Sequence, residues 1–166
     1  MTMRMIGAIV AAALVLVPEV HAAEVFSTPR ELVAAIYDDY NLGRTVADPS
    51  VYYSARLKGI LDLAIENDVF ASDAAMSGSE FTLDAVFNPF LPDVNALLFD
   101  VSIGEPSIID DRAVVNVSYH NFDQPRLLSI AMVHEEGGWR VDDVASMGNE
   151  EHWLLSWALT YDPLGF

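Results

Sequence analysis

The first clear alternation of hydrophobic and polar positions in the chain has the spacing of an amphipathic helix. Thr28-Pro29-Arg30-Glu31 is typical of a helix start, because threonine and glutamate at this spacing form a capping box and proline fits the first helical position. The apolar residues that follow at helical spacing are Leu32, Val33, Ile36, Tyr37 and Tyr40. They predict a helix that begins near Pro29 and ends before Gly43.

A second amphipathic pattern predicts a second helix. This helix begins at Asp48-Pro49 or Ser50 and ends at Asn67-Asp68. Its apolar face is formed by Tyr53, Leu57, Ile60, Leu61, Ala64 and Ile65. The small and polar residues 71–80 then predict a loop. Residues 81–92 are aromatic and contain Pro89 and Pro92, so they predict a short strand or an irregular crossing segment.

From residue 96 onward the hydrophobic period changes to two, which is typical of half-buried strands. The strands are predicted at residues 96–103, 112–120, 126–135 and 139–146. Glu135-Glu136-Gly137-Gly138 predicts a hairpin turn, because glycine readily takes the positive φ angles of such turns. Asn149 can cap a last helix, which ends at Pro163 and carries Trp153, Leu154, Trp157 and Ala158.

Two helices, a run of antiparallel strands and a final helix form a segregated α+β pattern. We expect a curved antiparallel sheet that wraps around the two N-terminal helices, with a short helix at the C-terminal end. No repeat or linker divides the sequence, so residues 23–166 are expected to form a single domain.

The segment before this domain has the features of a secretory signal peptide. Residues 1–22 contain Arg4, an apolar run from Ile6 to Val17 and small side chains before the predicted cleavage site after Ala22. The run is too short to span a bilayer. We therefore expect a periplasmic or secreted protein with no membrane insertion after cleavage.

The composition and the charge of the chain exclude several classes of binding partner. The chain of 166 residues has 25 Asp or Glu, 8 Lys or Arg, a net charge of -17 and no cysteine. Such an acidic chain is not expected to bind nucleic acid or anionic lipid. Without cysteine it has no disulfide, no thiolate metal site and no lipoprotein anchor. Apolar residues make up 52% of the chain, which is enough for one sizeable core.

The last predicted strand contains the sharpest candidate for chemistry. If Trp139 and Val141 point into the core, strict alternation directs Asp143 inward as well. A carboxylate in an apolar interior needs hydrogen bonds or a charge partner, and such residues are enriched at functional sites. Alternatively, Asp143 accepts hydrogen bonds from a helix end or an arginine, or a bulge returns it to solvent while Val144 turns inward. Whether Asp142 or Asp143 faces the interior is left open.

Other aromatic and polar residues could line a ligand pocket beside Asp143. Tyr37 and Tyr40 share one face of the first predicted helix, and their hydroxyl groups could act as hydrogen-bond donors. Ordinary core packing is the alternative for both tyrosines. The remaining candidate lining residues are Tyr53, Arg56, Asn88, Phe90, Asp93 and Trp139. For Arg56, a surface salt bridge is the alternative.

Recognisable catalytic and cofactor-binding motifs are missing from the sequence. It contains no G-x-S-x-G, Walker loop, H-E-x-x-H or dinucleotide-binding fingerprint. Pairs of adjacent carboxylates such as Asp38-Asp39 and Asp110-Asp111 do not form a calcium loop, because neighbouring side chains point in different directions. We therefore expect neither a metal nor a cofactor.

Four segments occur in an order that resembles a known family. They are LVAAIYDDY at residues 32–40, YSARL at 53–57, FNPF at 87–90 and GWRVDDV at 138–144. The chain resembles the secreted bacterial proteins of the domain-of-unknown-function family 3828, which are similar to the nuclear-transport-factor-2-like, cystatin-like superfamily. The resemblance covers nearly all of the chain after the predicted signal. It implies a cone whose helices and bent sheet enclose a cavity, and it implies no particular reaction.

The chain departs from this family at one position. The family tends to have Asp-Pro-Phe where this sequence has Asn88-Pro89-Phe90, so a role that needs a negative charge is not expected there. A hydrogen-bonding or turn role is compatible with Asn88. Asp93 lies where the family often carries a further acidic residue, and the resemblance implies that it takes over part of that role.

These observations favour a non-catalytic ligand-binding or interaction module with a cavity between the first helix and the sheet. Its ligand would be a small apolar or cationic molecule, or a protein partner, since a surface with a charge of -17 repels anions. One alternative is a proton-transfer enzyme of the isomerase or dehydratase type, with Asp143 as acid or base and Tyr37 or Tyr40 as donor to an oxyanion. Another is a protein–protein module that forms a homodimer through a sheet face or through the helix with Trp153 and Trp157.

Overall fold

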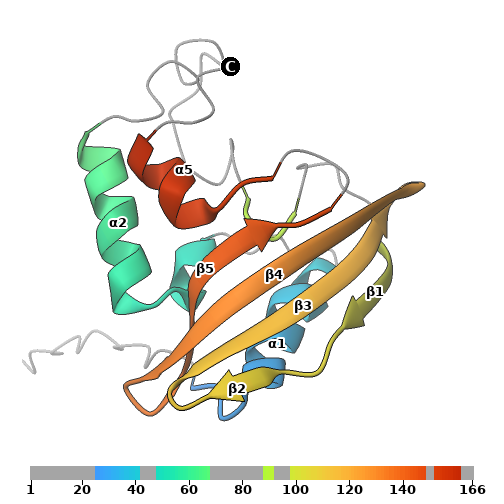
Figure 1. Cartoon of the computed structure of the whole chain (residues 1–166), viewed down its shortest axis with the longest axis horizontal. Coiled ribbons are helices and arrows are strands. Elements are labelled where there is room, and N and C mark those ends of the chain that lie inside the picture. Colours follow the sequence, from blue (N-terminus) through green and yellow to red (C-terminus); the bar gives the residue numbers. More distant parts are fainter. Residues whose placement is uncertain (1–24, 42–47, 68–87, 92–97, 149–151, 162–166) are drawn as a thin grey trace, which may run out of the picture.

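The computed structural model describes residues 25–41, 48–67, 88–91, 98–148 and 152–161. Within these residues the predicted α+β class is confirmed, with helices beside an open, five-stranded antiparallel sheet (Figure 1). The elements are α1 (Pro29–Asn41), α2 (Ala55–Glu66), β1 (Leu98–Ile103), β2 (Ser107–Ile109), β3 (Arg112–Asn121), β4 (Gln124–Glu135), β5 (Gly138–Ser146) and α5 (Leu155–Tyr161). The strand order is β1-β3-β4-β5, and the short β2 pairs with the beginning of β3.

The start of α1 is the capping box that the sequence predicts. The Glu31 carboxylate accepts hydrogen bonds from the backbone N–H groups of Ser27 and Thr28 at 3.1 and 3.2 Å, and the Thr28 hydroxyl oxygen accepts one from the Glu31 N–H at 3.2 Å. A hydrogen bond from the Ser27 hydroxyl stabilises the ionised carboxylate and lowers the pKa of Glu31 below its ordinary value. These contacts satisfy donors that a helix start otherwise leaves unpaired, so the helix begins at Pro29.

The second helix begins later than the sequence predicts. Asp48 caps only a short 3₁₀ turn, η1 (Pro49–Tyr52), after which the chain is extended at Tyr53 and Ser54. Ser54 is the N-cap of α2, and its hydroxyl oxygen accepts a hydrogen bond from a backbone N–H of the first turn at 3.1 Å. The predicted start at or just after Asp48 is wrong, because Tyr53 and Ser54 pair with β5 instead of continuing a helix.

Four of the predicted strands are confirmed, although buried and exposed residues alternate clearly only in β3 and in the middle of β4. β1, β3, β4 and β5 begin and end within two residues of the predicted bounds. β2 was not predicted, because three residues are too few to display a period. The hairpin turn is confirmed, but its positive φ angles belong to Glu136 (50°) and Gly137 (82°). Gly138 is instead the first residue of β5, where a Cβ would lie 3.1 Å from a side-chain carbon of Val25.

The last helix also begins later than predicted. α5 starts at Leu155, and the prediction that Trp153 and Leu154 belong to it is wrong, because both residues pair with β5. Asn149, the predicted cap, lies outside the described residues. The predicted signal (1–22), the predicted loop (71–80) and most of the crossing segment (81–92) also lie outside them.

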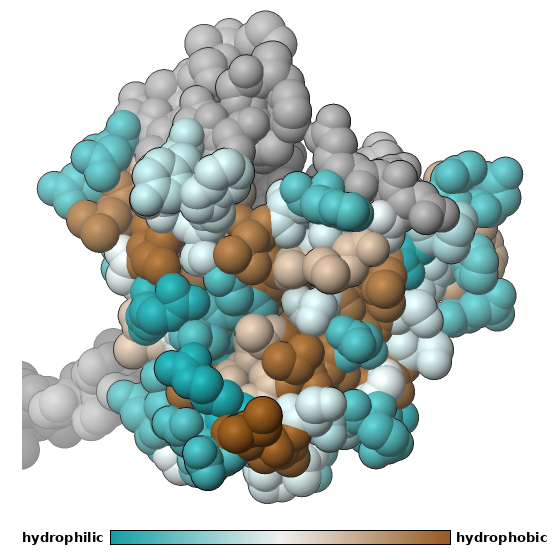
Figure 2. Space-filling model, in the orientation of Figure 1, coloured by the Kyte–Doolittle hydropathy of each residue, from teal (hydrophilic) through white to brown (hydrophobic). Residues whose placement is uncertain are grey.

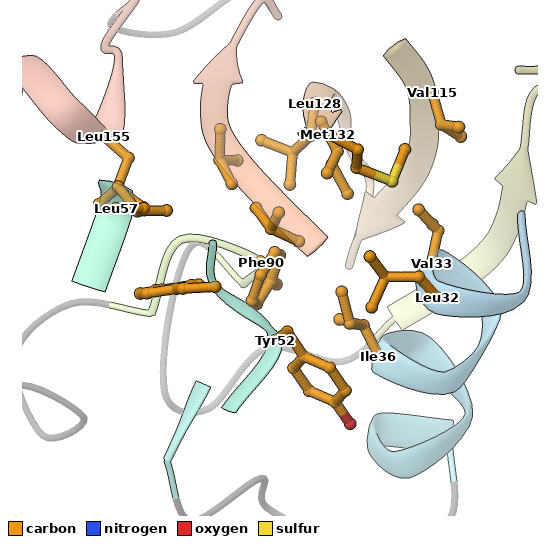
Figure 3. Packing of buried hydrophobic residues seen from close by; sticks show 14 of the residues in the cluster. Leu32, Val33, Ile36, Tyr52, Leu57, Phe90, Val115, Leu128, Met132 and Leu155 are labelled. Atoms are coloured by element: carbon orange, nitrogen blue, oxygen red, sulfur yellow. The ribbon is translucent and has the colours of Figure 1, made fainter. Parts of the chain in front are cut away.

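A hydrophobic core fills the space between α1 and one face of the sheet (Figure 3). Buried and exposed residues alternate along all of β3, as the strand period requires. The core residues from β3 are Ala113, Val115, Val117 and Tyr119, and those from α1 are Leu32, Val33, Ile36 and Tyr37. In Figure 1, α1 lies behind the sheet, whereas α2 and α5 lie together beside β5. Within the described residues, no helix covers the opposite face of the sheet.

β5 stands at the edge of the sheet, but three other segments hydrogen bond to it. The Phe26 carbonyl accepts a hydrogen bond from the second residue of β5 at 2.9 Å, and the Ser54 N–H donates to the Val141 carbonyl at 2.7 Å. The Trp153 carbonyl accepts a hydrogen bond from the last residue of β5 at 3.0 Å. Unpaired strand edges invite association with other strands, and these contacts occupy this edge. Because Phe26, Ser54 and Trp153 stand shortly before α1, α2 and α5, the starts of these helices are fixed to one strand.

Phe90 provides a test of this core. Its side chain is fully buried, its ring centroid lies 6.4 Å from that of Tyr53, and its carbonyl accepts a hydrogen bond from the Tyr37 hydroxyl. We expect Phe90→Ala to lower the free energy of unfolding by about 3–5 kcal/mol, because the lost ring leaves a cavity. Phe99 is 51% exposed, so the control Phe99→Ala should cost less than about 1 kcal/mol in the same urea titration. Equal losses for the two variants would contradict the described core.

Candidate functional site

The last strand contains a β-bulge at the adjacent carboxylates Asp142 and Asp143. The pairing of β4 with β5 shifts by one residue here, so that Asp142 is an extra residue in β5. The bulge resets the alternation, and Val141 and Val144 are both fully buried. Strict alternation, which directs Asp143 into the core, is therefore wrong. The alternative with a bulge is confirmed in that Val144 turns inward, but the bulge does not return Asp143 to solvent, since only 14% of its side chain is exposed.

Asp142 binds three side chains at the border between the sheet and α2. One carboxylate oxygen accepts hydrogen bonds from the Ser54 hydroxyl at 2.7 Å and from Arg56 Nε at 2.9 Å. The other oxygen lies 3.4 Å from the guanidinium group of Arg112 on β3. Arg56 also donates to the backbone carbonyl of Asp142. Only 9% of the Asp142 side chain is exposed, so these partners replace the water that it has lost.

The protonation of Asp142 follows from these contacts. Burial by itself raises the pKa of a carboxyl group, because it disfavours the charged form. Hydrogen bonds from Arg56 and Ser54, together with the charges of Arg56 and Arg112, outweigh burial and hold the pKa of Asp142 below its ordinary value. The hydrogen bond to Asp142 in turn raises the pKa of Arg56. Asp142 is therefore ionised at neutral pH, which suits an anchor for arginines and does not suit a general acid.

Asp143 caps the start of α5. Its carboxylate accepts hydrogen bonds from the Ser156 backbone N–H at 3.0 Å and from the Ser156 hydroxyl at 2.5 Å. It also lies 3.7 Å from a guanidinium nitrogen of Arg56. A carboxylate in this position satisfies free N–H groups and interacts favourably with the helix dipole. One alternative from the sequence is that Asp143 accepts hydrogen bonds from a helix end or an arginine. The structure shows this arrangement.

We call Ser54, Arg56, Asp142, Asp143 and Ser156 the carboxylate cluster. The cluster joins the starts of α2 and α5 to β5. Each of the four oxygens of the two carboxylates has a donor from the protein as a partner. In the part of the chain that the structure describes, no group of three or more His, Asp or Glu residues could hold a metal ion. The arrangement is that of an anchor between three elements.

Four of the nine predicted pocket residues pack in the core. Tyr37, Tyr53, Phe90 and Trp139 are all buried. The Tyr37 hydroxyl donates to the Phe90 carbonyl at 3.2 Å, and the ring of Trp139 meets the ring of His134 edge-on at a centroid distance of 5.3 Å. Side chains in protein cores interlock closely. A ligand among these four residues would have to displace core side chains.

The other predicted site residues are dispersed. Arg56 belongs to the carboxylate cluster, and Asn88 forms a turn in which its side-chain oxygen accepts a hydrogen bond from the Phe90 N–H at 2.9 Å. Asp93 lies outside the described residues, as does the side chain of Tyr40. Their participation in a site therefore stays a prediction.

Sequence reasoning did not single out three residues that bind the carboxylates: Ser54, Arg112 and Ser156. A signal exists for Ser54, because a serine directly before a helical hydrophobic pattern is a typical N-cap. Arg112 and Ser156 are 30 and 13 residues from their partners Asp142 and Asp143, and these contacts exist only in the folded chain.

Comparisons with known proteins leave the family of this chain open, because no protein-family model, no curated protein and no solved structure matches it. The resemblance to the domain-of-unknown-function family 3828 therefore stays a prediction. No helix among the described residues is both long and apolar enough to cross a membrane. Fold and site define an α+β protein in which two adjacent carboxylates anchor two helices to an edge strand.

Replacement of the Asp142 carboxylate tests the anchoring role. We expect Asp142→Asn to lower the free energy of unfolding by about 1–3 kcal/mol at neutral pH, because the neutral amide has the same shape but no charge to hold the two arginines. The matched control is Asp110→Asn in an exposed turn, where a positive φ suits asparagine and no measurable change is expected. Urea titration followed by circular dichroism measures both variants. Equal changes would contradict the anchoring role.

The lowered pKa of Asp142 also predicts an acid-dependent loss of stability. A carboxyl group whose pKa is lower in the folded chain stabilises the fold above its unfolded pKa, and this contribution is lost as the pH falls through the folded pKa. The difference in unfolding free energy between wild type and Asp142→Asn should therefore be largest near neutral pH and shrink below about pH 4. Urea titrations over a pH series measure it. A difference that persists unchanged in acid would show that ionisation of Asp142 does not stabilise the fold.

Proposed function

We propose that this protein is a non-catalytic interaction module of the periplasm or the cell exterior, whose uncovered sheet face binds a second copy of the chain. The observation that carries this proposal is the absence of acidic residues at the centre of that face, although the chain has a net charge of -17. A face of this kind is where two such chains can meet with the least electrostatic repulsion.

The outer sheet face comprises eight central positions of β3 and β4 that point away from the core. They are Arg112, Val114, Asn116, Ser118, Leu127, Ser129, Ala131 and Val133, which form four cross-strand pairs. Among these eight positions Arg112 carries the single charge, and it is paired with Asp142. Figure 2 views this face and shows pale and brown side chains over much of its middle.

The side chains of this face suit close contact between two sheets. Asn116 lies opposite Ser129, and Val114 lies opposite Ala131, so the middle of the face is built from small residues. Val114 and Leu127 are 39% and 38% exposed and offer apolar area that a partner sheet would bury. A homodimer with two-fold symmetry would place the same face of each copy in contact.

The other predicted functions have less support from the geometry. A proton-transfer enzyme that uses Asp143 needs an available carboxylate, but Asp143 is hydrogen bonded to Ser156. Small-ligand binding between α1 and the sheet needs space that Tyr37 and Phe90 occupy together. A dimer through the outer sheet face requires neither an available Asp143 carboxylate nor space between α1 and the sheet.

Two finer predictions remain part of the proposal. One is a cone-shaped curve of the sheet around its helices, which is supported by a core that lies against one face of the sheet. The other is export with cleavage after Ala22, which is supported by the composition of residues 1–22.

The proposal predicts a dimer whose stability increases with salt. We expect the chain from residue 23 onward to dimerise at micromolar concentrations, as measured by sedimentation equilibrium. Raising the ionic strength from about 0.01 to about 0.15 M shortens the screening length from about 30 to about 8 Å, so repulsion between the acidic chains weakens and dimerisation should tighten. A monomer under all conditions, or a dimer that weakens with added salt, would contradict the proposal.

A pair of charge substitutions locates the dimer contact. Val114→Glu places a carboxylate in the outer sheet face of both copies and should weaken dimerisation by about tenfold or more. Val51→Glu introduces the same charge at an exposed valine of η1 and should leave dimerisation unchanged. Loss of the dimer in the Val51 variant alone would assign the contact to another surface.

A further inference from the structure

Arg112 connects the outer sheet face to the carboxylate cluster. It carries the single charge among the eight positions of that face, and its guanidinium group lies 3.4 Å from a carboxylate oxygen of Asp142. Within the described residues, this is the ion pair that Arg112 forms. The acidic residues next to it in sequence, Asp110 and Asp111, are exposed in the turn before β3. The charge of the proposed dimer surface is therefore balanced by a residue that also anchors α2.

The Arg112 side chain extends across β4 to reach this partner. β4 lies between β3 and β5 (Figure 1), so at the usual spacing of strands the backbones of β3 and β5 are about 10 Å apart. Arg112 is directly opposite Val133 on β4, which in turn is opposite Arg140 on β5. Because Arg112 is on the outer side of β3, a contact of 3.4 Å with Asp142 requires its side chain to lie over the outer side of β4. A sheet that packs on this face therefore meets the Arg112 side chain.

The two members of this ion pair differ in their exposure to water. The Arg112 side chain is 67% exposed, whereas the Asp142 side chain is 9% exposed. In a single chain, water therefore solvates most of the guanidinium group. A partner sheet would remove that water, and a charge that loses its water needs a counter-charge within the contact. Asp142 supplies the counter-charge from a fixed position, because it also accepts hydrogen bonds from Ser54 and Arg56.

The outer sheet face of a second copy offers no counter-charge of its own. Apart from Arg112, its eight positions hold apolar or uncharged polar residues, and those next to Arg112 are Val114 and Val133. In a dimer with two-fold symmetry, this face meets the same face of the other copy. An Arg112 side chain without Asp142 would then lose water to uncharged groups, which disfavours association.

We infer that Asp142 is a positioning residue for association of two chains. Its carboxylate neutralises Arg112 and holds the guanidinium group across β4, so that the outer sheet face packs against its copy without an unpaired charge. This inference rests on the proposed function, because it requires a dimer through that face. It also implies that the anchor of α2 and the dimer contact share one carboxylate.

Removal of the carboxylate and of the arginine, singly and together, tests this role by sedimentation equilibrium. Asp142→Asn should weaken dimerisation by at least about tenfold, because each copy then brings an unpaired Arg112 into the contact. Arg112→Gln removes the charge itself and should dimerise within about threefold of the wild type. The double variant should dimerise like Arg112→Gln, so that loss of the arginine rescues the loss of the carboxylate.

Asp143→Asn is the matched control for the loss of one negative charge. It removes a carboxylate from the adjacent position of the same cluster, but Asp143 binds Ser156 and Arg56. Its dimerisation should stay within about threefold of the wild type. Circular dichroism shows whether each variant is folded. Rescue by Arg112→Gln separates neutralisation from a general loss of stability, because removing a second charged group would not restore a weakened fold.

Three outcomes would overturn the inference and leave the proposed dimer intact. One is an Asp142→Asn variant that dimerises as tightly as the wild type or more tightly. Another is equal weakening in the Asp142 and Asp143 variants, and the third is a double variant that stays as weak as Asp142→Asn. A monomeric wild type, or a dimer that tolerates Val114→Glu, would instead contradict the dimer contact and this inference together, so the two failures are distinguishable.

Discussion

The β-bulge in the last strand is the constraint on which the rest of the structure depends. Because Asp142 is an extra residue in β5, the two adjacent carboxylates turn toward Ser54 and Ser156 while Val141 and Val144 both enter the core. Asp142 then holds the start of α2, and Asp143 holds the start of α5. The backbone contacts of Phe26, Ser54 and Trp153 act on the same strand, so β5 fixes the starts of α1, α2 and α5.

The same constraint decides where function can be located. A carboxylate with little exposed surface is stable only when hydrogen bonds or positive charges replace its water, and Asp142 has both. These contacts suit an anchor between the sheet and the two helices. The aromatic side chains that could line an internal pocket pack in the core. The dimer contact that we propose is therefore on the outside of the molecule, on the sheet face that no described helix covers.

Elements whose signals are local could be predicted from the sequence. The capping box at Thr28 and Glu31 placed the start of α1 correctly, and the period of two located β1, β3, β4 and β5. The starts of α2 and α5 were placed too early, because Ser54 and Trp153 hydrogen bond to β5 instead of belonging to a helix. The bulge had one readable signal: Val141 and Val144 enclose two aspartates, and strict alternation cannot bury both valines. Whether Tyr37 and Phe90 line a pocket or pack in the core depends on how closely α1 approaches the sheet. No local sequence pattern predicts that distance.

Amide hydrogen exchange measures the anchoring role of the two carboxylates most directly. The account predicts that Asp142→Asn speeds exchange in the first turn of α2, that Asp143→Asn does so in α5, and that β3 and β4 keep their protection in both variants. Unchanged protection of α2 and α5 in both variants would contradict the claim that these carboxylates hold the helices in place.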